Sequence, residues 1–484
     1  METNAIVLSD ITTVPQALQV IGDLLTMIGQ MQVRIDALEL ENKRLRDQRH
    51  LDSSNSRLPP SSDKGRGTRA TRSLRQPSGR KPGGQPDHPG ATLKPVETPD
   101  KRIVHPVFQC PGCGQDVSAV PVIRVEKRQV FEFPPMMLEV TEHQAEIKIC
   151  PRCAQELHGA FPADVQQPVQ YGARVKGLLG YLNQGQLLPY ERTTTLVEDL
   201  VGQPVSQGTL LTANQTCSAQ LVEAEAVVKH TLQQAPVVHV DETGLYENGQ
   251  RIWLHSASTP TLTYYFPHPK RGQEAMRAAD ILPHFQGTAV HDHWEAYQQF
   301  AQCRHAFCNA HHLRELQRAI DQDQASWAAD MKTLLLHIKE QVEQAKAAGQ
   351  PALLSDQLAQ FQTQYRDIVE RALQPYLNAP ASTSPPARGR RKQTTTKNLL
   401  DRFDTYQAET LRFMTDFRVP FDNNLAERDL RMTKVKQKIS GTFRSSAGTR
   451  AFCRIRGFIS TLKKQGRNVL EELAHTFNAV PNTT

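Results

Sequence analysis

The sequence lacks a long apolar run. Its hydrophobic residues make up 38% of the chain, and no uninterrupted stretch of them approaches the roughly 18 residues that a membrane-spanning helix needs. It also shows no N-terminal signal peptide, so we expect a cytoplasmic protein with reduced thiols. Its cysteines are then better suited to metal ligation than to disulfides.

The chain is too long for one hydrophobic core, since it has 484 residues. It carries 57 Lys and Arg against 50 Asp and Glu, a net charge of only +7. The basic residues are unevenly placed, however, and their clusters favour binding to a polyanion such as nucleic acid. We therefore expect several domains and a polyanionic partner such as nucleic acid.

The N-terminal segment 1–52 predicts a coiled-coil dimerisation helix. Apolar residues alternate spacings of three and four, with one Asn at an a position that would fix the register of a two-stranded coil. The seam consists of Ile21, Leu24, Ile28, Met31, Ile35, Leu38, Asn42 and Leu45. The alternative is a single amphipathic helix that packs on its own domain.

Residues 53–100 predict a basic linker that is disordered when free. Ser, Pro and Gly dominate it, and no acid interrupts its run of basic residues. These are Lys64, Arg66, Arg69, Arg72, Arg75, Arg80 and Lys81. They could lie along DNA phosphates or merely keep a tether in solution.

Residues 101–160 predict a zinc-binding ribbon with one structural Zn²⁺. Two Cys-x-x-Cys pairs supply four thiolates, the donor set of tetrahedral zinc: Cys110, Cys113, Cys150 and Cys153. Strand-like segments at 120–133 and 138–149 flank Pro134-Pro135 and predict a long hairpin between the pairs. A redox pair or a chance pattern are the alternatives. The unpaired cysteines are expected in cores: Cys217, Cys303, Cys308 and Cys453.

Residues 161–232 predict a helical domain. Within it, the sequence of residues 196–211 predicts a helix, a Gly turn and a second helix capped at Ser206. A helix-turn-helix DNA reader has this pattern, and so does any small helical bundle.

Residues 233–440 predict an α/β domain of the ribonuclease-H-like plan. The run Val237–Gly244 indicates a buried strand that ends on Asp241, and a later strand, Thr288–His291, is followed by Asp292. Two strands and a helix separate them, and a short helix and a fifth strand follow, which gives the order β-β-β-α-β-α-β.

Glu427, which lies far downstream on a predicted helix, is the candidate for a third carboxylate beside Asp241 and Asp292. Its neighbours Asn424, Arg428 and Arg431 share one helix face with it. A helical insertion at about 312–418 separates this helix from the strands. His311 and His312 open the insertion, and a structural or DNA-facing role suits them better than a metal role.

The segment 441–484 predicts a basic C-terminal helical segment, with one last helix over 452–476. Between Arg428 and Arg456 nine Lys or Arg accompany a single acid, Asp429. A charged run is usually a solvated face, but its position after Glu427 favours phosphate contacts. The candidate DNA-binding residues are Arg428, Arg431, Lys434, Lys436, Lys438 and Arg444.

The chain as a whole resembles transposases of the bacterial insertion-sequence-sixty-six family. The resemblance follows the same order along the chain and includes the N-terminal coiled-coil helix and the two Cys-x-x-Cys pairs, which we call knuckles. It also includes four short motifs: Val240-Asp-Glu-Thr243, Asp292-His-Trp-Glu-Ala-Tyr297, Cys308-Asn-Ala-His311 and Asn423-Asn-Leu-Ala-Glu-Arg428. It implies an Asp-Asp-Glu transposase that moves its own element, with small accessory proteins of that element as partners.

The three acids also predict the chemistry. Carboxylates that converge in one pocket repel one another unless cations neutralise them, and Mg²⁺ prefers oxygen ligands. Asp241, Asp292 and Glu427 would hold two Mg²⁺ for cutting element ends and joining the 3′-hydroxyls to target DNA. A nuclease or resolvase of the same fold would cut without joining, and a zinc-containing DNA-binding regulator would do neither.

Overall fold

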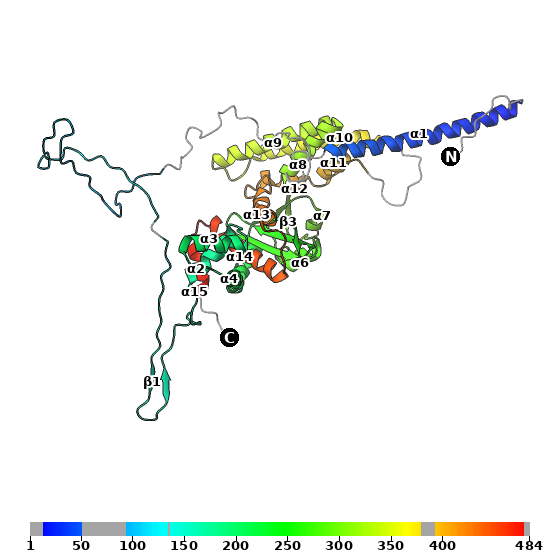
Figure 1. Cartoon of the computed structure of the whole chain (residues 1–484). Coiled ribbons are helices and arrows are strands. Elements are labelled where there is room, and N and C mark those ends of the chain that lie inside the picture. Colours follow the sequence, from blue (N-terminus) through cyan, green and yellow to red (C-terminus); the bar gives the residue numbers. More distant parts are fainter. Residues whose placement is uncertain (1–12, 51–92, 134–135, 379–392, 479–484) are drawn as a thin grey trace. The chain divides into compact units, whose positions relative to one another are not determined.

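The computed structural model describes residues 13–50, 93–133, 136–378 and 393–478. Helix α1 (Val14–His50) comes first (Figure 1), and the predicted basic residues from Lys64 to Lys81 lie outside the described residues. Beyond α1, a larger compact unit contains 171–189 and 210–478, and a smaller one contains 93–170 and 190–209. None of the helices in the described ranges is long and apolar enough to cross a membrane.

The larger unit is built on a mixed five-stranded sheet in the order β5-β4-β3-β6-β7. Its strands are β3 (Val237–Glu247), β4 (Gln250–Ser258), β5 (Thr263–His268), β6 (Thr288–His291) and β7 (Arg304–Phe307). The first three form an antiparallel meander, and β6 and β7 are added in parallel. The predicted sequence of strands and helices in this region is confirmed.

The central strand is longer than the sequence indicated. We predicted that it ends on Asp241, but β3 continues to Glu247 because it pairs with β4 from His239 to Glu247. A two-residue turn joins them, and Asn248 and Gly249 adopt φ of 48° and 76°, the left-handed conformation of tight hairpin turns. Pairing with β6 stops at His239, so β3 loses its parallel neighbour just before the acid.

Each face of the sheet packs on helices. On one face, Val238 and Val240 contact side chains from α5 (Val222–Gln233), α6 (Gln273–Ala279) and the region of α7 (Glu295–Gln298). On the other face, Val237 and Val290 join the core of the helical insertion. Gly287 is needed where β6 starts, because a Cβ there would lie 2.6 Å from the carbonyl oxygen of Ala235.

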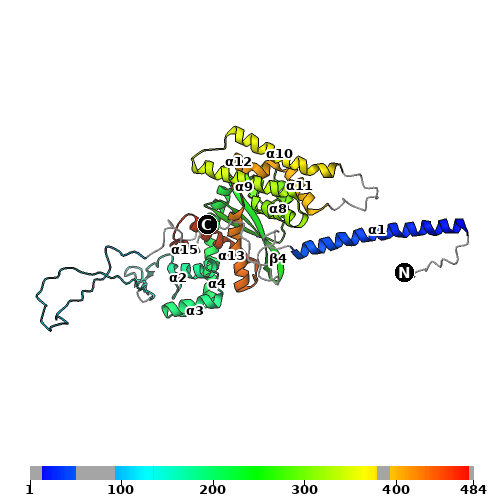
Figure 2. The ribbon, with the colours of Figure 1, turned by 90° about the horizontal axis from the view of Figure 1, so that it is seen from above.

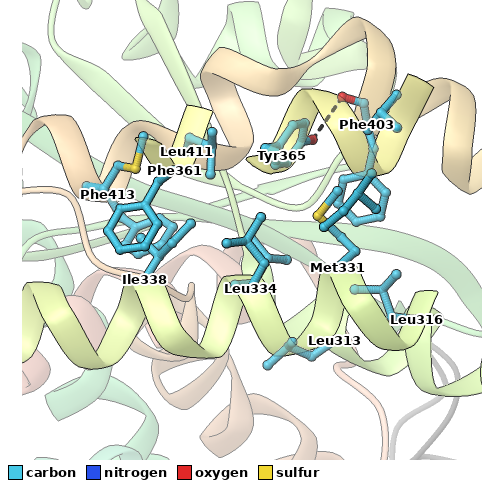
Figure 3. Packing of buried hydrophobic residues seen from close by; sticks show 14 of the residues in the cluster. Leu313, Leu316, Met331, Leu334, Ile338, Phe361, Tyr365, Phe403, Leu411 and Phe413 are labelled. Carbon is cyan, nitrogen blue, oxygen red and sulfur yellow. Dashed lines mark hydrogen bonds between the residues drawn. The ribbon is translucent and has the colours of Figure 1, made fainter. Parts of the chain in front are cut away.

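The predicted helical insertion is a packed bundle between β7 and α13. It contains α8 (Asn309–Asp323), α9 (Ser326–Ala347), α10 (Ser355–Leu377), α11 (Thr395–Thr405) and α12 (Gln407–Thr415). Figure 2 shows α9 and α10 side by side on the outer side of the bundle. Its core includes Met331, Leu334 and Phe403, and the Tyr365 hydroxyl donates to the Phe403 carbonyl at 2.8 Å (Figure 3).

The C-terminal region consists of α13 (Asn424–Ser440), α14 (Ser446–Lys464) and α15 (Val469–Asn478). The single helix predicted over 452–476 is therefore wrong. It breaks at Gly466, whose φ of +69° lies outside helical geometry. Helix α14 packs on β5, and α15 packs on α2 (Ala173–Gly180), where Gly177 allows close approach to Ala474.

The smaller unit has little regular structure. The predicted hairpin strands at 120–133 and 138–149 do not form over their described residues, except that β1 (Ile147–Ile149) pairs with β2 (Glu156–His158) around the second knuckle. The composition of these two segments is typical of strands, but their apolar side chains stay exposed. A strand is stabilised mainly by the packing of its side chains on neighbours, so composition alone did not produce strands here. Helix α3 (Tyr190–Val201) also belongs to this unit.

The predicted turn between two helices is present. Helix α3 is followed by Gly202 with φ of +70°, and α4 (Gln207–Gln220) begins after Ser206. The Ser206 hydroxyl accepts a hydrogen bond from the backbone N–H of Thr209 at 3.0 Å, which is the expected N-cap.

Candidate active site

The first two acids lie side by side at the edge where the parallel strands end. His239 of β3 is paired with Val290 of β6, so continuing that register by two residues places Asp241 beside Asp292. Both carboxylates are oriented by backbone N–H groups. Oδ1 of Asp241 accepts from Glu242 at 2.8 Å, and Oδ1 of Asp292 accepts from Trp294 at 2.9 Å.

Burial and the closeness of other acids both act on the carboxylates at this edge. Burial raises the pKa of Asp241 well above its ordinary value, and the nearby charges of Glu242, Asp292 and Glu427 raise it further. Burial also raises the pKa of Glu427, with Arg314 acting in the opposite direction and Asp292 in the same direction. Glu427 thus lies within electrostatic reach of both strand acids although it comes from α13.

Asn423 fixes the helix that carries Glu427. This residue is only 2% exposed and precedes α13. Its side-chain amide donates to the carbonyl of Val240 at 2.9 Å, and its Oδ1 lies 2.8 Å from Nδ1 of His239. Its backbone N–H points at Sγ of Cys308 at 3.1 Å. The start of α13 is therefore tied to the ends of β3 and β7, one helical turn before Glu427.

Asp429 is the second residue, after Asn423, that holds α13 in place. Its Oδ2 accepts from Ser258 at 2.6 Å and pairs with Lys464 at 2.7 Å, while its carbonyl accepts from the hydroxyl of Tyr265 at 2.7 Å. The single acid of the basic run is therefore a structural residue. It joins α13 to β4, β5 and α14.

Glu427 faces the first turns of α8. Its Oε1 lies 3.9 Å from Nε2 of His311 and 3.7 Å from Nη2 of Arg314. His312 is fully buried instead, with its Nδ1 3.0 Å from Oδ1 of Asn309. The two adjacent histidines therefore differ: His312 belongs to the core, as the sequence favoured, and His311 borders the acids.

Glu242 points to the opposite face of β3 from Asp241 and is already bonded. Its Oε1 accepts from Nε and Nη2 of Arg271 at 2.9 and 2.6 Å, and its Oε2 accepts from the hydroxyl of Tyr297. The Arg271 guanidinium stacks between Trp253 and Trp294, at 4.9 and 4.2 Å from their ring centroids. This arrangement holds Glu242 as a buried, paired carboxylate.

Sequence reasoning assigned no role to Arg271, Tyr297 or Asn423. The only local signal was that Tyr297 and Asn423 stand in the short motifs that contain Asp292 and Glu427. Arg271 lies in a loop without any such pattern, and only the tertiary structure brings it to Glu242.

The predicted DNA-binding residues divide into two groups. Arg428, Arg431, Lys438 and Arg444 are exposed. The other two are engaged with the protein: the exposed Lys434 donates to the carbonyl of Gly244, and the ammonium of the half-buried Lys436 lies 4.4 Å from the ring centroid of Phe443. Burial lowers the pKa of both lysines.

The two cysteine pairs have the same backbone geometry. In each, the first Cys donates to the carbonyl five residues later, at 2.9 Å for Cys110 and 2.8 Å for Cys150, and accepts from the residue four later. Backbone N–H groups of Cys113 and Gly112 lower the pKa of Cys110, and those of Cys153 and Arg152 lower that of Cys150. The donor set and its thiolate-stabilising turns fit a tetrahedral zinc ion.

The structure does not draw all candidate ligands together. In the described ranges, the one group of three or more metal-binding residues with donor atoms within 4.8 Å of one another is Cys308, His311 and Glu427. The two knuckles do not form such a group, and neither Asp241 nor Asp292 belongs to it.

Comparison with known families gives two matches. The family model described as "Transposase IS66 family" matches residues 169–451, and the model described as "zinc-finger binding domain of transposase IS66" matches residues 109–154. The first contains all three acids and the second all four knuckle cysteines. No curated protein matches the chain.

Proposed function

Because the matched region spans more than half of its length, the chain belongs to the IS66 family of transposases and has a zinc-finger domain, and we propose that it is an Asp-Asp-Glu enzyme. In this proposal it cuts the ends of its own element and joins the freed 3′-hydroxyls to target DNA. The observation that supports it is that Asp241 and Asp292 both follow the paired stretch of the parallel strands β3 and β6, with Glu427 of α13 close enough for its charge to raise the pKa of Asp241. We propose the bacterial cytoplasm, on nucleoid DNA, as the place of this reaction.

We propose that the larger unit has the ribonuclease-H-like fold. Its support is the antiparallel β3-β4-β5 meander extended by parallel β6 and β7, with β3 in the centre. The placement of one acid on the central strand and another directly after its parallel neighbour adds to it. The insertion at α8–α12 then lies between the second and third acids of the active site.

Asp241, Asp292 and Glu427 would hold two Mg²⁺, since oxygen ligands suit this ion and the crowded carboxylates need positive charge beside them. Bound Mg²⁺ would supply an activated water and stabilise charge on the leaving oxygen. Asn423 and Asp429 fix α13 against the sheet, which keeps Glu427 within electrostatic reach of the strand acids. The exposed Arg428 and Arg431 are positioned to bind the DNA phosphates.

We propose that the four knuckle cysteines hold one structural Zn²⁺ and that α1 forms a parallel dimer. The described seam side chains of α1 are 41–60% exposed from Ile21 to Leu38, which leaves an apolar stripe for a second copy of the helix. The side chain of Leu45 lies outside the described part of the helix. A dimer would suit the joining of two element ends, and small accessory proteins remain proposed partners.

The test is a gel assay on labelled element ends, with binding, nicking and strand transfer measured in parallel. Asp241→Asn, Asp292→Asn and Glu427→Gln should each abolish cleavage and strand transfer while DNA binding stays intact, because phosphate contacts come from Lys and Arg. Glu242→Gln is the matched control, and it should retain more activity than Asp241→Asn because its oxygens are bonded to Arg271 and Tyr297.

The same assay separates the rival functions. Cleavage without joining of a pre-cut end would indicate a nuclease or resolvase. Normal cutting by all three acid variants would remove the catalytic assignment and leave a zinc-containing DNA-binding regulator. Normal cutting by Glu427→Gln alone would place the third ligand elsewhere.

A further inference from the structure

We propose that Cys308, His311 and Glu427 form a second metal site, which takes a thiophilic divalent cation such as Zn²⁺ and inhibits DNA cleavage when it is occupied. The inhibitory part rests on the proposed function, because Glu427 would be shared with the Mg²⁺ that supports cleavage. The binding part stands on the geometry of the three side chains alone.

The donor atoms are already gathered. Sγ of Cys308, a ring nitrogen of His311 and a carboxylate oxygen of Glu427 lie within 4.8 Å of one another, and Nε2 of His311 is 3.9 Å from Oε1 of Glu427. Zinc binds these donors at about 2.0–2.3 Å, so small side-chain rotations would close the site.

Rigid elements hold all three positions. Cys308 is the N-cap of α8 and His311 stands three residues later, so both belong to the first turn of one helix. Glu427 comes from the first turn of α13, and the hydrogen bond from the Asn423 N–H to Sγ of Cys308 fastens the starts of the two helices together. Burial raises the pKa of the Cys308 thiol, with the Asn423 N–H acting in the opposite direction, so binding of a cation to the sulfur would release the thiol proton.

The donor set selects against Mg²⁺. Thiolate and imidazole favour Zn²⁺, whereas Mg²⁺ prefers carboxylate, carbonyl and water oxygens. Three protein ligands with one open position is also a common arrangement for accessible zinc. The opposing charge is Arg314, 3.7 Å from Glu427, whose long side chain would have to turn away when the cation binds.

Occupancy would remove Glu427 from the strand acids. A carboxylate that is held at Cys308 and His311 cannot at the same time complete the ligand set of Asp241 and Asp292. Excess Zn²⁺ should therefore inhibit cleavage even in the presence of Mg²⁺, although the zinc-finger domain needs the same metal.

The experiment uses the full-length protein and two independent readouts. Equilibrium dialysis against Zn²⁺ with metal analysis should find one more bound Zn²⁺ per chain in the wild type than in Cys308→Ser or His311→Gln. In the Mg²⁺ cleavage assay, the rate of each protein is expressed relative to its own rate without zinc. Both variants should need at least about tenfold more Zn²⁺ than the wild type for half-inhibition.

Cys217→Ser is the matched control, since Cys217 is another buried thiol and lies outside the cluster. It should bind and respond to Zn²⁺ like the wild type. Equal zinc content in the wild type and His311→Gln, or equal inhibition of both, would overturn the proposal. If the wild type does not cleave DNA with Mg²⁺, the proposed function fails, and the dialysis comparison still decides whether this site binds metal.

Discussion

Nδ1 of His239 lies 2.8 Å from Oδ1 of Asn423, although 184 positions separate the two residues in the chain. Both are buried, and the same Asn side chain donates to the carbonyl of Val240. The contact joins the strand that carries Asp241 to the helix that carries Glu427.

Asn423→Ala should therefore weaken both stability and catalysis. The change removes the hydrogen-bond partner of the buried His239 ring and of the Val240 carbonyl. The free energy of unfolding, measured by chemical denaturation, should therefore fall by about 2 kcal/mol. Cleavage should fall with little change in DNA affinity, because the helix position shifts and the basic surface does not. Asn424→Ala is the control, since the neighbouring side chain is exposed. Equal effects of the two changes would contradict the anchoring role.

The acid cluster predicts a pH and metal effect on stability. Burial and the charges of Glu242 and Asp292 raise the pKa of Asp241, so its contribution to stability is present at low pH and is lost as pH rises through that raised pKa. At neutral pH, without added divalent cations, Asp241→Asn should melt higher by roughly 2–4 °C in calorimetry. Ca²⁺ should then stabilise the wild type more than the variant.

The control for this prediction is Asp404→Asn, which changes an exposed acid of α11. It should alter neither the melting temperature nor the response to Ca²⁺. A destabilised Asp241→Asn protein would show that burial and the neighbouring acids do not disfavour the charged Asp241 carboxylate in the folded state.

The exposed and covered basic residues of α13 should respond differently to truncation. Arg431→Ala should weaken DNA binding and reduce the slope of log affinity against log salt by about one, because one phosphate contact is lost. Lys436→Ala should chiefly reduce thermal stability, since its side chain covers Phe443. Filter-binding titrations at several salt concentrations would test both, and an unchanged slope for Arg431→Ala would remove it from the DNA interface.

The zinc finger predicts a metal-dependent local fold. Purified protein should carry structural Zn²⁺, and Cys110→Ser should lose it and expose the small unit to limited proteolysis, because structural zinc contributes folding energy. Cys453→Ser provides a control outside the knuckles. Knuckle thiols that titrate freely in the native wild type would contradict this prediction.

The exposed seam of α1 predicts a dimer. Deletion of residues 1–50 should lower the mass measured by light scattering, because the Ile21–Leu38 stripe would lose its partner. Leu24→Glu offers a milder test, since it places like charges opposite each other in a parallel pair. An unchanged mass in both proteins would mean that another surface forms the main interface.

Local patterns in the sequence determined much of this protein. The β-branched run before Asp241, the order of strands and helices around it, the knuckles and the helical character of the insertion were predictable, because each depends on short-range periodicity, turn residues or ligand spacing. The same reasoning failed for the hairpin at 120–149 and for the break at Gly466, where composition resembled a regular element but packing and backbone geometry decided otherwise.

Only the tertiary structure decided what each polar residue does. Asp241 and Glu242 are neighbours with similar chemistry, yet the alternation of a strand sends one to the acid cluster and the other to Arg271 and Tyr297. Asp429 became a partly buried anchor because Lys464 and Ser258 reach it from other elements. Contacts between residues far apart in the chain leave no local signal, and the burial they create sets the charge and role of each side chain.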